Sequence, residues 1–126
     1  MSRVKAKSVL YFTQKEEEFA NLLMKIGIKK NVARVLVYLA NAPEATSRDI
    51  ERGTDLRQPE VSIAMASLIE QQWVESREKK AENKGRPVKI YRLSKPIDEI
   101  MDSIEREKRD EATKQMKLIQ QLRSYL

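Results

Sequence analysis

Seven lysine and arginine residues are concentrated between positions 77 and 92 of a chain of 126 residues. Only two acidic residues, Glu78 and Glu82, lie in the same stretch, which therefore carries a net charge of +5. The whole chain carries +6, and residues 57–76 carry −2. A local excess of positive charge on an otherwise balanced chain is typical of a surface that binds a polyanion. A solvated lysine-rich loop has the same charge pattern, so charge alone leaves both interpretations open.

The residue types give little support for catalysis, metal binding or membrane association. The chain contains neither cysteine nor histidine, which excludes disulfides, thiolate metal sites and the commonest general base. It also lacks a glycine-rich phosphate loop and a nucleophile beside a base, so we expect no enzyme, no cofactor and no metal. The longest apolar run, residues 35–40, is too short to span a membrane. We therefore expect a cytoplasmic protein that does not associate with membranes.

The first half of the sequence predicts four helices. Thr13 and Glu16 have the spacing of a capping box that begins the first helix, and Gly27 ends it. Apolar residues at helical spacing predict a second helix over 31–42. Thr46 and Asp49 predict a short third helix, with Gly53 in the left-handed position at its end.

The second half predicts a longer helix, a hairpin and a last helix. Pro59 fits the first turn of a fourth helix, and apolar residues at helical spacing give that helix a buried face. Residues 73–77 and 88–93 are predicted strands, joined by a charged loop over 78–87. The last helix begins at Pro96 and runs to about residue 126. Its distal half has an apolar stripe that a small domain cannot cover, which predicts a partner helix; a frayed, solvated tail is the alternative.

The order of these elements resembles the archaeal winged-helix transcriptional regulators, close to the TrmB-like and ArsR/MarR-like groups. The residues that carry the resemblance are 28–39 (IKKNVARVLVYL), 46–53, 58–68 (QPEVSIAMASL), 73–74 and 85–93 (GRPVKIYRL). The resemblance implies a mainly α fold with a small β-hairpin, a winged helix-turn-helix domain and a long C-terminal dimerisation helix. The implied domains are a basic arm over 1–14, a DNA-binding domain over 15–94 and a dimerisation helix over 95–126.

The resemblance assigns the fourth helix as the recognition helix, which enters the major groove of DNA by its N-terminal end. Gln pairs well with adenine, Arg with guanine, and Ser with either base. Ile63 and Ala66 stand where related proteins often carry Arg or Lys, so they contact thymine methyl groups or belong to a partner surface. The predicted DNA contacts of this part of the chain are Arg48, Arg57, Gln58, Ser62, Ile63 and Ala66. Helix capping and solvation are the alternative roles of Arg57 and Gln58.

The hairpin corresponds to the wing of the family and fits phosphate binding better than the acidic recognition helix does. Its predicted DNA contacts are Lys79, Lys80, Lys84, Arg86 and Lys89. Arg86 lies between Gly85 and Pro87, which would hold it at the rim of the hairpin near a phosphate or a narrow minor groove. Arg3, Lys5 and Lys7 form either a second DNA-contacting arm or a disordered tail.

The predicted function is a sequence-specific regulator of transcription that binds double-stranded DNA as a homodimer. The predicted dimer interface comprises Tyr11, Phe12, Met116, Ile119, Leu122, Tyr125 and Leu126. Two alternatives are a winged helix that binds protein within a transcription assembly and an architectural protein that binds DNA without sequence preference. The sequence leaves open the operator, any small-molecule effector, and activation versus repression.

Overall fold

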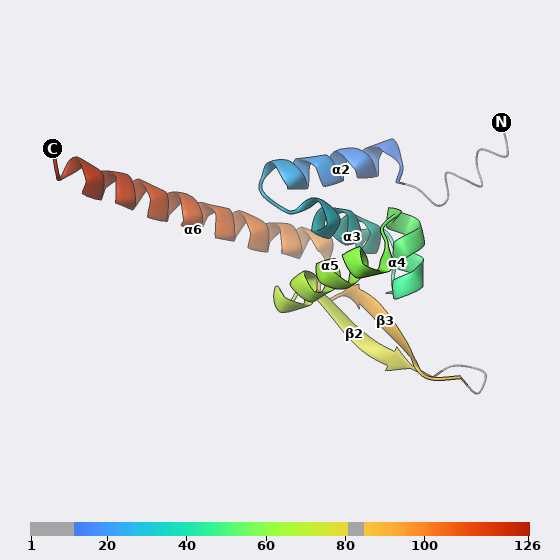
Figure 1. Cartoon of the computed structure of the whole chain (residues 1–126). Helices are drawn as coiled ribbons and strands as arrows, with labels where there is room; N and C mark the ends of the chain where they lie inside the picture. Colours follow the sequence, from blue (N-terminus) through green and yellow to red (C-terminus); the bar gives the residue numbers. More distant parts are fainter. Residues whose placement is uncertain (1–11, 81–84) are drawn as a thin grey trace. The chain divides into compact units, whose positions relative to one another are not determined.

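The computed structural model describes residues 12–80 and 85–126. The chain divides into two compact units, Met1–Ser94 and Lys95–Leu126. In the described part of the first unit, four helices and three short strands follow one another in the order α2, α3, β1, α4, α5, β2, β3, and the second unit is built on α6 (Figure 1). The expected fold class, mainly helical with a small β-structure and a long last helix, is confirmed.

Helix α2 (Gln14–Lys25) begins and ends as the sequence predicts. The Thr13 side chain accepts a hydrogen bond from the backbone N–H of Glu16 at 3.1 Å. The Glu16 carboxylate in turn accepts from the backbone N–H of Thr13 at 2.8 Å. Gly27 has a φ of 107°, which favours glycine and turns the chain towards the next helix. Both predicted boundary signals are therefore confirmed.

Helix α3 (Lys30–Ala40) is the central helix of the first unit, because it packs against α2, α4 and α5. Its buried residues are Ala33, Val35, Leu36, Val37 and Leu39. The helical spacing of apolar residues predicts a buried stripe of Val32, Val35, Leu36, Leu39 and Ala40. Of these, Val32 and Ala40 are only half-buried, and the stripe does not include the buried Ala33 and Val37. The difference arises because a single stripe describes a helix with one buried face, whereas α3 has neighbours on several sides.

Helix α4 (Ser47–Thr54) is the short helix that precedes the recognition helix. The predicted role of Gly53 as its left-handed C-terminal residue is wrong, because the helix runs to Thr54 and Asp55 has a φ of 60°. The buried Thr54 hydroxyl donates to the carbonyl of Ile50 at 2.6 Å within the last turn of the helix. Gly53 is required for a different reason: the ring of Tyr38 in α3 fills the space of a Cβ atom at this position.

Helix α5 (Gln58–Glu70) follows a turn of three residues and has Pro59 in its first turn, as expected. Its buried residues are Val61, Ala64, Met65 and Leu68, which face α3 and α4. The helical spacing predicts these four residues and Ile69 on the buried face; Ile69 is 40% exposed.

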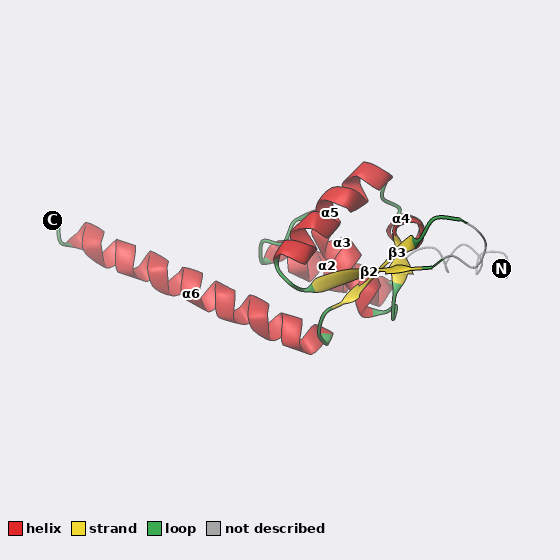
Figure 2. Cartoon of the chain, turned by 90° about the horizontal axis from the view of Figure 1, so that it is seen from below, coloured by secondary structure: helices red, strands yellow, loops and turns green. Residues whose placement is uncertain are grey.

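The sheet contains one strand more than the expected hairpin. β2 (Val74–Lys79) and β3 (Val88–Leu93) pair antiparallel, and β1 (Ala45–Thr46) pairs with the other edge of β3. A strand of two residues has no sequence periodicity, so it could be found only from its partner. β1 leads directly into α4, and β3 lies beside α4 in Figure 2. The sheet therefore fixes the start of α4 next to the middle of β3.

Helix α6 (Ile97–Arg123) begins directly after Pro96 and is about 40 Å long. Its buried residues are Ile100 and Ile104. From Arg109 to Leu126 every side chain is exposed. The predicted long last helix is thus present, and its distal half has no cover from the described part of the chain.

Candidate nucleic-acid interface

The N-terminal end of α5 is built to present polar side chains to solvent. The Glu60 carboxylate accepts a hydrogen bond from the backbone N–H of Arg57 at 2.8 Å and fixes the first turn. The buried face of α5 points to α3 and α4, so the opposite face is open. The five positions predicted on this helix are all exposed; they are Arg57, Gln58, Ser62, Ile63 and Ala66.

Three of the predicted DNA contacts, which are distant in sequence, line one hollow. Arg48 comes from α4, Gln58 from α5 and Lys89 from β3. The hollow measures about 550 Å³, and its remaining lining residues are Thr46, Ser47, Glu51 and Val88. Sequence reasoning missed Ser47, although it follows the N-cap of α4 directly. The hollow thus joins the start of α4, the start of α5 and the end of β3 that adjoins the wing loop.

The start of α4 is held rigid by a reciprocal cap. The Asp49 carboxylate accepts from the backbone N–H of Thr46 at 3.0 Å, and the Thr46 hydroxyl accepts from the backbone N–H of Asp49 at 3.1 Å. The backbone hydrogen bond from Thr46 is the main cause that lowers the pKa of Asp49 below its ordinary value. The carboxylate is therefore charged at neutral pH and occupied by the cap and by Arg52, 3.4 Å away.

The wing contains two kinds of basic residue. Arg77 pairs with Glu44 at 3.3 Å, and Arg92 pairs with Glu75 across the β2–β3 ladder at 2.7 Å. The other basic residues of the described wing are exposed and have no salt bridge within residues 12–80 and 85–126; they are Lys79, Lys80, Arg86 and Lys89. Lys84 lies outside the described residues. The four unpaired cations are all among the predicted phosphate contacts.

The negative charge of residues 57–76 is not concentrated at the exposed start of α5. Glu60 is occupied by the N-terminal cap, and Glu75 lies in β2 and pairs with Arg92. Glu70 is the last residue of α5, at the opposite end from Gln58. Glu70 and Glu75 therefore lie away from Gln58, whereas Glu60 stays in the first turn of α5 as part of the cap.

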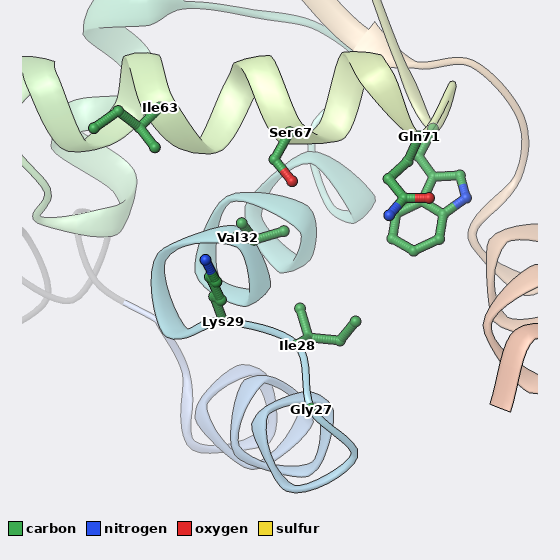
Figure 3. Close-up of a pocket in the computed structure, with 8 residues that line it drawn as sticks. Gly27, Ile28, Lys29, Val32, Ile63, Ser67 and Gln71 are labelled. Atoms are coloured by element: carbon green, nitrogen blue, oxygen red, sulfur yellow. The ribbon is translucent and has the colours of Figure 1, made fainter. Parts of the chain in front are cut away.

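A second hollow, of about 240 Å³, lies between α5 and the segment that leads into α3 (Figure 3). Ile63 and Ser67 point into it from α5; Ile28 and Lys29 from the turn before α3, and Val32 from α3, face them. Its remaining lining residues are Gly27, Gln71 and Trp73. Ile63 is also part of the adjoining hollow beside Lys30 and Asn31. The basic pair Lys29 and Lys30 next to α5 was not predicted; two adjacent lysines at a predicted helix start were the available signal.

The predicted dimer residues fall into two groups. Phe12 is half-buried, and the Arg34 guanidinium lies 4.4 Å above its ring. Arg34 also bonds Glu17 at 3.1 Å and the Thr54 carbonyl at 3.3 Å, so Phe12 lies at the junction of α2, α3 and α4. Tyr11 lies outside the described residues. The α6 members are all exposed; they are Met116, Ile119, Leu122, Tyr125 and Leu126.

The described residues form neither a cluster that could bind a metal ion nor a helix that could span a membrane. Within residues 12–80 and 85–126, three or more acidic side chains never gather in a way that could hold a metal ion. None of the helices in this part of the chain has both the length and the apolar character needed to cross a membrane.

The comparisons with known proteins point to one family. Residues 26–86 match the family model of the MarR family. A solved structure described as a possible transcriptional regulator from Methanosarcina mazei Go1 superposes with a TM-score of 0.57 at 18% identity, covering 73% of this chain and 79% of that chain. NadR in complex with 4-hydroxyphenylacetate superposes with a TM-score of 0.51 at 20% identity, covering 98% and 87%. A comparison with curated proteins gave no match.

These matches support the MarR part of the expected resemblance, while a TrmB-like or ArsR-like assignment and an archaeal origin stay predictions. At such low identity, the solved structures establish the arrangement of elements and not the activity. The chain has the winged-helix fold of the MarR type.

Proposed function

We propose that this chain is a MarR-family transcriptional regulator that binds specific sequences of double-stranded DNA as a homodimer. The observation that carries the proposal is the shared hollow of Arg48, Gln58 and Lys89, which come from three different elements. A recognition helix in the major groove needs side chains that read bases and flanking cations that hold phosphates. Gln58 fits the first role, and Arg48 and Lys89 fit the second.

The wing supplies the affinity in this proposal. Lys79, Lys80, Arg86 and Lys89 are exposed and have no acidic partner in the described chain, so they are available to phosphates. Lysines and arginines that neutralise phosphates release counterions, which makes binding strong at low salt and independent of sequence. Arg86 at the rim of the hairpin also suits a narrow minor groove, where A·T-rich sequences attract arginine.

The start of α5 supplies the choice of sequence. Gln58 and Ser62 are exposed on the open face of the helix, where base edges would lie. Ala66 on the same face can contact a thymine methyl group, whereas Ile63 points into the second hollow beside Ser67. In this proposal residues 15–94 bind DNA, residues 95–126 join two copies, and the protein works in the cytoplasm without catalytic activity.

The proposal is tested by selecting bound sequences from a pool of random duplex DNA at moderate salt. A homodimer is expected to enrich a palindrome whose half-sites lie about one helical turn, or a multiple of it, apart. Retention of DNA without any enriched sequence would favour an architectural protein. No retention even at low salt would overturn DNA binding as the function.

One observation favours a second candidate, a winged helix that binds protein. Ile63 is 74% exposed and lies between two hollows, next to Lys29 and Lys30. An exposed apolar side chain between hollows is suited to a protein partner as well as to DNA. The variants Ile63→Glu and Lys89→Glu distinguish the two candidates. A DNA-binding regulator is expected to lose DNA binding in both variants, whereas a protein-binding module is expected to lose its partner only in Ile63→Glu.

A further inference from the structure

Two lysines lie beside α5 on the side of the turn into α3. Lys29 and Lys30 are exposed and form no salt bridge within residues 12–80 and 85–126. Both line the hollow that adjoins Ile63. Lys29 also lines the second hollow, across from Ser67 (Figure 3). Two unpaired cations therefore stand next to the middle of α5.

The helical period of α5 places these lysines on the flank opposite Arg48 and Lys89. Successive residues of an α-helix are turned by about 100° around its axis, so Gln58 and Gln71 lie about 70° to either side of the middle of the buried face. Gln58 shares its hollow with Arg48 and Lys89. Gln71 shares the second hollow with Lys29. The open face of α5 therefore runs between two flanks, each of which carries exposed cations.

Double-stranded DNA offers phosphates on both sides of a helix that enters its major groove. The groove is about 12 Å wide and an α-helix with its side chains is about 10–12 Å across, so the helix lies between the two sugar-phosphate backbones. Arg48 and Lys89 fit the backbone on the first flank. The backbone of the other strand then runs along the flank where Lys29 and Lys30 lie.

We infer that, within one half-site, Lys29 and Lys30 bind phosphates of the DNA strand opposite the one that Arg48 and Lys89 contact. Phosphate contacts fix the register and orientation of a protein on the duplex. Contacts on both strands do so more firmly, because contacts on one flank alone leave the helix free to roll in the groove. The inference rests on the proposed DNA binding and adds a second phosphate-binding flank with the residues that form it.

The surroundings of the two lysines favour a polyanion. Among the described residues that line their two hollows, Glu60 is the only acidic one, and its carboxylate is engaged by the backbone N–H of Arg57 at 2.8 Å. A protein with an acidic, partly apolar surface is the alternative partner, because Ile63 beside the lysines is 74% exposed. DNA is favoured because cations on both flanks of one open helix face match its two backbones, whereas a protein partner requires them on one flank only.

The salt dependence of DNA binding measures the contribution of the two lysines. Lys29→Gln with Lys30→Gln in the full chain should reduce the slope of log affinity against log salt by about 1 for each lysine in each subunit, on selected and random duplexes alike. Lys29→Arg with Lys30→Arg keeps both charges and should keep the original slope.

A matched control removes the same charge from another surface. Lys15 and Lys25 are exposed on α2, form no salt bridge in the described chain and line neither hollow. Lys15→Gln with Lys25→Gln should therefore leave the slope close to that of the original chain. An equal fall in slope for this control and for the Lys29 and Lys30 variant would overturn the inference, because net charge alone would then explain the effect.

Ethylation of single phosphates identifies the strand that each flank contacts. An ethylated phosphate that a lysine binds weakens binding of the original chain, and the variant without that lysine no longer senses it. On the selected duplex, Lys29→Gln with Lys30→Gln should lose this sensitivity on one strand of each half-site and Lys89→Gln on the other.

The outcomes separate the inference from the proposed function. Loss of sensitivity on the same strand for both variants would overturn the two-flank arrangement and leave DNA binding standing. A variant of Lys29 and Lys30 with the slope and ethylation pattern of the original chain would also overturn it, and would leave the lysines to a protein partner. An original chain that binds no duplex even at low salt would overturn the inference and the proposed function together.

Discussion

The ring of Tyr38 in α3 occupies the space into which a side chain on Gly53 of α4 would extend. This contact sets how closely α4 approaches the central helix. α4 also packs against α5 and the sheet, so the same contact influences where Arg48 and Gln58 stand around their hollow. The position of the recognition residues therefore depends on a glycine that contacts neither of them.

Gly53→Ala is expected to destabilise the chain by about 1–3 kcal/mol, because the added methyl group overlaps the Tyr38 ring. Tyr38→Leu in the same chain removes part of the overlap, so the double variant should lose less than the sum of the two single losses. Urea unfolding of the four chains measures the coupling. Simple additivity would show that the two residues do not constrain one another.

The cap of α4 should make stability depend on acid pH. The pKa of Asp49 is lower in the folded chain than its ordinary value of 3.8, chiefly because its carboxylate accepts the Thr46 N–H. Its charged form therefore adds stability above that value, and this contribution is lost as the pH falls through the folded pKa. Asp49→Asn should cost about 0.3–1 kcal/mol at pH 7 and less at about pH 3, which lies below the ordinary pKa of the carboxyl group. Urea unfolding measures the loss of stability at the two pH values. An equal loss at both would show that the charge of Asp49 does not stabilise the cap.

Lys89 and Arg92 provide a matched test of the wing, because both are exposed cations on β3. Lys89→Gln should weaken binding to specific and random DNA alike and reduce the salt slope by about 1 for each phosphate contact in each subunit. Arg92→Gln should leave the slope unchanged, because Arg92 already pairs with Glu75 at 2.7 Å. Fluorescence anisotropy at several salt concentrations measures both slopes. Equal slopes for the two variants would remove the distinction between paired and unpaired cations.

Ser62 and Ser67 test which face of α5 contacts the DNA bases, because both serines lie on this helix. Ser62 lies on the open face, whereas Ser67 points into the hollow beside Val32 (Figure 3). Ser62→Ala should cost about 1–3 kcal/mol on the preferred site and little on random DNA, while Ser67→Ala should change neither. Gln58→Ala should behave as Ser62→Ala does. Binding titrations on the two duplexes give the comparison, and a loss for Ser67→Ala alone would place the DNA on the wrong side of α5.

Local patterns in the sequence predicted most helix boundaries. The capping pairs Thr13–Glu16 and Thr46–Asp49 form as expected, because both partners lie three residues apart and need no tertiary contact. The buried face of α5 was also predicted, since a helix of this period with one covered side repeats its apolar residues regularly. The sequence likewise predicted that the wing is a basic segment, but it did not show which of its cations form ion pairs.

Long-range packing decided the rest. The need for glycine at position 53 comes from Tyr38, fifteen residues away, and the pairing of Arg77 with Glu44 joins residues that no local pattern connects. The strand β1 exists only because β3 offers it an edge. The sequence by itself determined the helices, their caps and the charge of each segment, because these depend on neighbours along the chain. Only the tertiary structure decided that Arg48, Gln58 and Lys89 share one hollow, because the packing of distant elements brings them together.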